Sequence, residues 1–123
     1  MIVAKPGTLR DSLHALMTAL PKVNVICETD DISKALEVVT QHSPDLVLLG
    51  GDFPVDEMWV FLRLIRKRSP QTFRLILADT VGQKTEMEAP GAEVIRLKGT
   101  TPVELVADIE RLLAARPSAP RLT

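Results

Sequence analysis

Several charged residues stand directly after short aliphatic runs, where they could act together. They are Lys5, Asp52, Asp79 and Lys98. The two lysines, with a helix that starts near Gly7-Thr8, could hold a small anion, because ammonium groups and free helix amides both favour negative charge. Carboxylates near the same lysines could instead neutralise them as ion pairs. The residue types therefore leave two roles open, an anion site or a set of internal ion pairs.

Composition argues against several other kinds of site and partner. The chain has 123 residues with a net charge of -1, so no overall basic field draws it to nucleic acid or to a membrane. The single Cys27 cannot form an internal disulfide, and His14 and His42 lie far apart, so no metal or cofactor motif is recognised. No apolar run approaches the roughly 20 residues of a membrane span. The N-terminus lacks the pattern of a signal peptide, and we expect a cytoplasmic protein.

Short apolar runs alternate with helical patterns along the chain. The runs are nearly continuous in Val, Ile and Leu, which is typical of strands that helices bury on both faces. The predicted strands are Ile2–Ala4, Val23–Cys27, Leu46–Leu49, Leu75–Leu77 and Val94–Leu97. Apolar residues at helical spacing predict helices over Leu9–Leu20, Ile32–Val39 and Met58–Ile65, and a capping box with Pro at the first position starts another at Thr101.

This alternation predicts an α/β fold with a parallel sheet. Five strands in this length favour a flavodoxin-like (βα)5 three-layer sandwich with the strand order 2-1-3-4-5. The fourth helical segment, within Asp79–Gly91, contains a Gly and a Pro, so we expect it to be short or partly irregular. We assign residues 1–115 to one domain and 116–123 to a disordered tail or the stub of a linker.

Three stretches of the chain resemble one protein family, and they follow one another along the sequence in the family's order. "DLVLLGGDFP", Asp45 to Pro54, is similar to the third strand and following loop of response regulator receiver domains. "LRDSLHALMTAL", Leu9 to Leu20, resembles the first helix of receivers that precede a helix-turn-helix output domain. "GAEVIRLKGTTPVEL", Gly91 to Leu105, resembles the family's fifth strand, its lysine and the start of its last helix. The resemblance covers the chain to about Ala115.

The resemblance also locates the family's phosphorylation chemistry, and most of it is missing here. Family positions for two metal-binding acids, the phosphoacceptor Asp, the Ser or Thr, the aromatic switch residue and the lysine are occupied by Ala4, Lys5, Gly50, Ala78, Ile95 and Lys98, respectively. Only Lys98 matches. Transfer of a phosphoryl group to a carboxylate needs a nucleophilic oxygen and a cation, and Gly50 has no side-chain oxygen. We predict no phosphoacceptor and no metal site, with Asp52 as an outside candidate acceptor.

The expected partners of the lysines follow from these positions. Lys98 is expected to pair with Asp52 or Asp79. Lys5 is expected either to replace the absent metal as a counter-charge for acids such as Glu28, Asp30 or Asp52, or to point to solvent.

We therefore predict a phosphorylation-independent signalling or transcription-regulating domain that is not an enzyme and acts through protein–protein contacts. The alternative is a sensor of a small anion or phosphorylated ligand that uses Lys5 and Lys98. The resemblance implies a protein partner or a homodimer. From the charge and the short apolar runs we expect no direct nucleic-acid contact by this domain and no membrane association. Arg96, on the expected edge strand, would discourage edge pairing.

Overall fold

The computed structural model describes residues 1–21, 23–24, 27–88 and 92–115. Its strands form one parallel sheet in the order β2-β1-β3-β4-β5, as predicted for a flavodoxin-like fold. The strands are β1 (Ile2–Val3), β2 (Glu28–Thr29), β3 (Leu46–Gly50), β4 (Phe73–Ala78) and β5 (Val94–Leu97).

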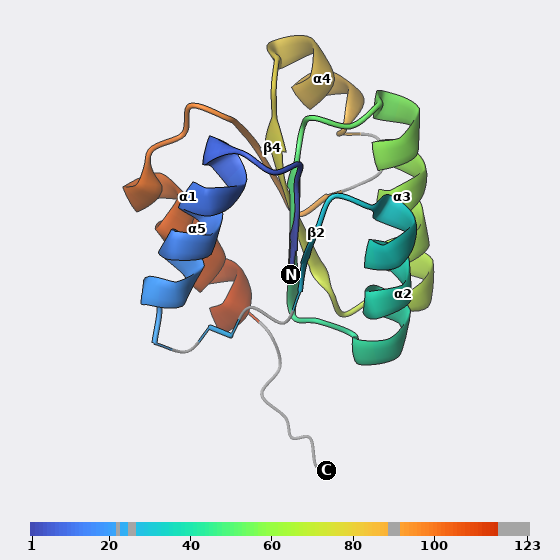
Figure 1. Ribbon diagram of the computed structural model, residues 1–123, viewed down its shortest axis with the longest axis horizontal. Coiled ribbons are helices and arrows are strands. Elements are labelled where there is room, and N and C mark those ends of the chain that lie inside the picture. Colours follow the sequence, from blue (N-terminus) through green and yellow to red (C-terminus); the bar gives the residue numbers. More distant parts are fainter. Residues whose placement is uncertain (22, 25–26, 89–91, 116–123) are drawn as a thin grey trace.

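Helices cover both faces of this sheet and complete the three predicted layers. They are α1 (Thr8–Ala19), α2 (Ile32–His42), α3 (Val55–Arg68), α4 (Val81–Glu86) and α5 (Pro102–Ala114). Helices α1 and α5 lie on one side of the sheet and α2 and α3 on the other, while α4 lies beyond the end of β4 (Figure 1). The expected short fourth helix is confirmed, since α4 has 6 residues.

The continuous aliphatic strands supply a core on each face. In β3, Leu46 and Leu48 pack with residues of α1 and α5, whereas Val47 and Leu49 pack with residues of α2 and α3. Successive strand side chains point to opposite faces, so a strand covered on both faces must be apolar at every position. The whole of β3 is buried.

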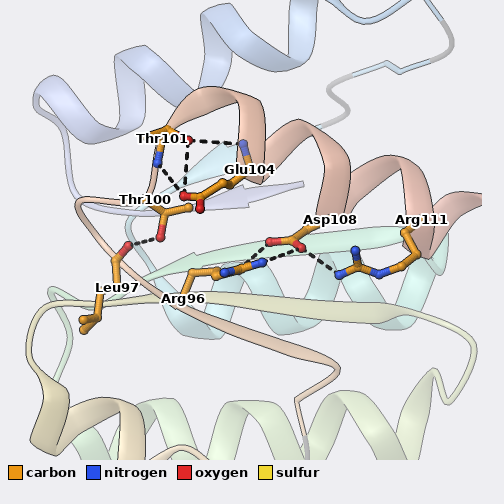
Figure 2. Close-up of polar contacts among 7 residues, drawn as sticks. All are labelled: Arg96, Leu97, Thr100, Thr101, Glu104, Asp108 and Arg111. Atoms are coloured by element: carbon orange, nitrogen blue, oxygen red, sulfur yellow. Dashed lines mark hydrogen bonds and ion pairs between the residues drawn. The ribbon is translucent and has the colours of Figure 1, made fainter.

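Local hydrogen bonds define where two of the helices begin. Thr101 and Glu104 form the predicted capping box, in which the Thr101 hydroxyl accepts from the Glu104 amide at 3.3 Å and the Glu104 carboxylate accepts from the Thr101 amide (Figure 2). Asp31 caps α2 by accepting from the amides of Ser33 and Lys34. Such caps satisfy helix amides that have no partner within the helix.

The predicted position of the second strand was wrong. The sequence indicated Val23–Cys27, whereas β2 is Glu28–Thr29 and pairs with Ile2 and Val3. Val23 instead belongs to a turn, in which its amide donates to the carbonyl of Leu20 at 3.1 Å. The Cys27 carbonyl accepts from the Ile2 amide at 2.9 Å, so the ladder starts where the predicted strand ends. Residues 25–26 and the predicted tail, 116–123, lie outside the described residues.

Across the ranges that the structure describes, no helix is long and apolar enough to cross a membrane.

Candidate functional site

The carboxyl end of β3 is occupied by a carboxylate from the following loop. Asp52 Oδ2 accepts a hydrogen bond from the main-chain amide of Lys5 at 3.1 Å, which ties the loop after β3 to the residue after β1. A Cβ atom added to Gly50 would lie 2.7 Å from Asp52 Oδ1 and 3.2 Å from Ala4 Cβ. The Asp52 carboxylate therefore fills the space in which a side chain at position 50 would begin.

The second oxygen of this carboxylate has an unusual environment. Asp52 Oδ1 is buried and has no hydrogen-bond partner among the described residues. A buried acceptor without a partner costs on the order of 1–3 kcal/mol. The loop holds Asp52 in this position although the carboxylate is only half satisfied there.

Gly51 is required by a close approach between two loops. The Gln83 side chain donates from Nε2 to the Gly51 carbonyl at 2.9 Å and accepts at Oε1 from the Asp79 amide at 2.7 Å. A Cβ atom on Gly51 would lie 2.7 Å from the Asp79 nitrogen and 2.9 Å from the Leu77 oxygen, which are both main-chain atoms. Gln83 thus clamps the loop after β3 to the loop after β4 across a site with no room for a side chain.

The lysine that matches the family pattern is engaged in an ion pair. Lys98 Nζ lies 3.1 Å from Asp79 Oδ1, and both side chains are partly exposed. The prediction that Lys98 pairs with Asp52 or Asp79 is confirmed for Asp79. The pair follows from the topology, because β4 and β5 are neighbours and both residues stand at the same edge of the sheet.

Lys5 contacts Asp52, but not as a counter-charge, and the residue is exposed, which agrees with the predicted alternative that its side chain points to solvent. The contact is made by the main-chain amide, while the ammonium lies 5.8 Å from the centroid of the Phe53 ring. Glu28, another predicted partner of Lys5, instead lies 3.7 Å from Arg10 and contacts His14 Nδ1.

The remaining positions of the predicted site carry only aliphatic side chains. Ala4 and Ala78 are fully buried, and Ile95 is partly buried against the core under α2 and α3. Magnesium binds carboxylates, waters and phosphate oxygens, and none of these three side chains offers an oxygen. Among the described residues, no three His, Cys, Asp or Glu side chains gather closely enough to hold a metal ion.

Sequence analysis missed two buried ionic clusters. Arg74, on β4, is only 1% exposed; its guanidinium donates to the Leu62 carbonyl at 3.0 Å and to Glu93 Oε2 at 3.1 Å. Glu93 Oε1 also accepts from the Arg74 amide at 2.7 Å. The sequence shows Arg74 as a single charge within an apolar strand and does not indicate that Glu93 is its partner. The pairing depends on the register between β4 and the segment that enters β5.

The second cluster joins β5 to α5 (Figure 2). Asp108 is fully buried and accepts from Arg96 Nε at 2.7 Å, from Arg96 Nη2 at 3.0 Å and from Arg111 at 2.7 Å. The hydrogen bond from Arg96 is the main cause that lowers the pKa of the Asp108 carboxyl below its usual value, and burial opposes it. Arg96 does lie on the edge strand, as predicted, but its side chain links the sheet to α5.

The strand order and the helical layers define a flavodoxin-like fold, and comparison with solved structures identifies it as the fold of receiver domains. The signal receiver domain of the response regulator NarL from Mycobacterium tuberculosis aligns over 88% of this chain and 89% of its own, with a TM-score of 0.75 and 25% identity. A LuxR-family two-component response regulator from an Aurantimonas species aligns over 94% and 84%, with a TM-score of 0.79 and 24% identity.

A third neighbour is a CheY-like receiver domain protein from Methanospirillum hungatei, with a TM-score of 0.80, 17% identity and coverage of 94% and 92%. No protein-family model and no curated protein matches the sequence. The structural neighbours are thus response regulator receiver domains, and the predicted resemblance is confirmed by the fold.

Proposed function

We propose that this chain is a receiver-like signalling domain that works without phosphorylation, through contact with a partner protein. Its structural neighbours are receiver domains of response regulators, including LuxR-family members, which supports a place in two-component signalling or transcription regulation. The proposal includes no enzymatic activity of its own. Among the described residues no cluster could hold a metal ion, and Asp79, a carboxylate at such a strand end, is engaged in an ion pair with Lys98.

One observation carries this proposal: the Asp52 carboxylate folds over Gly50. An acceptor oxygen must reach the phosphorus atom in line with the leaving group, and a cation must neutralise the developing charge. Asp52 Oδ2 is held by the Lys5 amide, and Oδ1 is buried beside Gly50. Ala4 offers no side-chain oxygen to a cation at the neighbouring strand end. The carboxylate closest to the family's acceptor position is therefore poorly placed to react.

The consequence is a domain with a fixed strand-end geometry. Gln83 bridges the loops after β3 and β4, and Lys98 is paired with Asp79. In the absence of a covalent switch, the surface offered to a partner would depend on the abundance of the domain or of the partner rather than on a phosphorylation state.

The alternative, an anion sensor that uses Lys5 and Lys98, is less well supported by the geometry. Asp79 neutralises Lys98, and the Lys5 ammonium lies by Phe53. A thermal-shift series with inorganic phosphate and acetyl phosphate separates the two functions, because a ligand that binds only the folded state raises the melting temperature. If the domain is an interaction module, we expect no rise in melting temperature at millimolar concentrations of either ligand.

We further propose that the partner is a protein in the cytoplasm, met either by this domain alone or by a homodimer. A net charge of -1 disfavours direct contact with nucleic acid.

Intact-mass measurement tests the proposed function. The protein is incubated with acetyl phosphate and Mg²⁺, with a phosphorylatable receiver domain as the positive control and Asp52→Asn as the matched variant. We expect no phosphoryl adduct on this chain. An adduct that disappears in Asp52→Asn would contradict the proposal.

A further inference from the structure

A groove lies on the α2–α3 side of the molecule, near the carboxyl edge of the sheet. It is bounded by the loops after β2 and β3, by the start of α2 and by α3 as far as Leu64, and the two helices pack side by side (Figure 1). Its volume is about 600 Å3. We call it the α2–α3 groove.

The groove has an apolar floor. The residues that form it are Ile32, Leu36, Phe53, Phe61 and Leu64. Val60 also lines the groove and is 54% exposed. Among the described residues, the exposed large hydrophobic side chains are Val60, Val81 and Val103. Of these three, Val60 lines the groove. An exposed apolar side chain in the lining is a suitable contact for an apolar anchor of a partner.

The rim of the groove is acidic. Its charged lining residues are Asp30, Asp31, Asp56 and Glu57, and no Lys or Arg is among the lining residues. Three of them have a structural role: Asp31 caps α2, and Asp56 and Glu57 lie in the first turn of α3, where the helix dipole favours negative charge. Asp30 has no such helix-capping role.

The acidic rim is exposed to solvent even though three of its residues also stabilise helix starts. All four acidic side chains are exposed, and the ion pairs found among the described residues include none of them. Three of the four basic residues of α3 lie in its last turn, and the fourth, Arg63, lies over the Trp59 ring at 4.7 Å from its centroid and is not among the lining residues. Lys5 lies near the floor, with its ammonium 5.8 Å from the Phe53 ring centroid, and a single cation leaves the groove negative overall.

We propose that the α2–α3 groove is a docking site for a basic amphipathic helix of a partner protein. This inference rests on the proposed function and names the partner's chemistry. An amphipathic helix places apolar anchors at i, i+3, i+4 and i+7 into such a groove, with Lys and Arg beside them. The acidic rim attracts those cations and repels nucleic acid and acidic peptides, so charge complementarity selects the partner.

The probe is a fluorescent helical peptide of about four turns, with Leu on one face and Lys on the other. We expect saturable binding in anisotropy titrations and amide shifts confined to residues of the groove. A counterpart with Glu in place of Lys should not bind. Binding that is equal for both peptides, or amide shifts that map elsewhere, would overturn the proposal.

Matched variants separate the groove from general charge. Asp56→Asn with Glu57→Gln should weaken binding by about fivefold to tenfold, since each exposed ion pair contributes modestly. Glu86→Gln with Glu88→Gln makes the same change of charge outside the groove and should leave binding unchanged. Val60→Ser should weaken binding, whereas Val103→Ser, at a valine that is 80% exposed, should not. If the groove variants and their matched controls weakened peptide binding equally, the proposed docking site would be contradicted.

Two further measurements exclude other occupants. A proline-interrupted peptide of the same composition should bind weakly, and equal binding would mean an extended segment rather than a helix. Dilution of the protein alone should leave the groove amides unchanged, and concentration-dependent shifts there would identify a second copy as the occupant. Acetyl phosphate treatment followed by the titration separates the two proposals. A phosphoryl adduct contradicts the proposed function, whereas a protein that forms no adduct and does not bind the peptide in the groove contradicts only the docking site.

Discussion

Gln83 lies directly against the side of Gly51 on which a side chain would stand, and the two residues hold the loops after β3 and β4 together. The Gly51 carbonyl accepts from Gln83 Nε2 at 2.9 Å, and Gln83 is itself 9% exposed. The glycine pair at the end of β3 thus serves two separate needs. Gly50 makes room for the Asp52 carboxylate, and Gly51 makes room for Gln83 and the β4 loop.

We predict that Gly51→Ala lowers the free energy of unfolding by about 1–3 kcal/mol. Its new methyl would press against main-chain atoms of Leu77 and Asp79, which cannot move away as a flexible side chain could. Gly99→Ala is the matched control, because a Cβ atom there meets nothing within 4 Å. Urea unfolding checks both variants, and equal stability of the two would contradict the close approach at Gly51.

Arg74 and Arg66 offer a comparison of two arginines that contact the same carboxylate. Arg74 Nη2 lies 3.1 Å from Glu93 Oε2 and its side chain is 2% exposed, whereas Arg66 Nη1 lies 3.9 Å away and its side chain is 63% exposed. Arg74→Met should cost on the order of 3 kcal/mol of stability, and Arg66→Met under about 1 kcal/mol. Chemical denaturation measures both, and a larger loss for Arg66→Met would show that the buried contact is misassigned.

The main-chain amine of Met1 predicts a pH dependence. It donates to the Leu46 carbonyl at 2.9 Å, and burial is the main cause that lowers its pKa from 8.0 to about 6. Above pH 8 the amine is neutral in both states. As the pH falls towards 6, the unfolded chain binds the proton first, so folding stability decreases by about 2–3 kcal/mol at most. Acetylation of Met1 in the 123-residue chain should abolish this decrease in folding stability between pH 8 and 6. Identical profiles of stability against pH for the acetylated and free forms would contradict the prediction.

Asp108 predicts the opposite behaviour at acid pH. Its pKa is lowered, mainly by the hydrogen bond from Arg96, so it stabilises the fold above the ordinary carboxyl pKa of about 3.9. This stabilisation is lost as the pH falls through the lower pKa of the folded state. Asp108→Asn should therefore be less stable than the parent near neutral pH, with a gap that narrows in acid. Glu110→Gln, an exposed neighbour, is the control, and a constant gap would argue against the ion pair.

The elements that the sequence predicted are those with strong local patterns. The capping box at Thr101 and the apolar stripes of α1, α2 and α3 are local features, and each appears where expected. The pair of Lys98 and Asp79 was among the alternatives because neighbouring strands bring their following residues to one edge. The second strand was misplaced because a run of apolar residues near Val23 outweighed Glu28, whose side chain is polar although its main chain pairs with β1.

Other parts of the site could not be derived from the sequence. The return of Asp52 over Gly50 depends on loop geometry, which spacing along the chain does not define. Gln83 lies in a segment with little periodicity, and nothing in its neighbours indicates that its side chain would reach Gly51. Arg96 and Asp108 pair across β5 and α5, and only the packing of that helix on the sheet brings them together.

The central claim is that the strand end at Gly50 has no covalent on-off state. The most direct measurement is an amide NMR spectrum of the isotope-labelled chain, recorded with and without beryllium fluoride and Mg²⁺. We predict that the amides of Gly50, Gly51 and Asp52 keep their positions. Saturable shifts of these amides that are lost in Asp52→Asn would show a phosphoryl mimic bound at this strand end and would contradict the account.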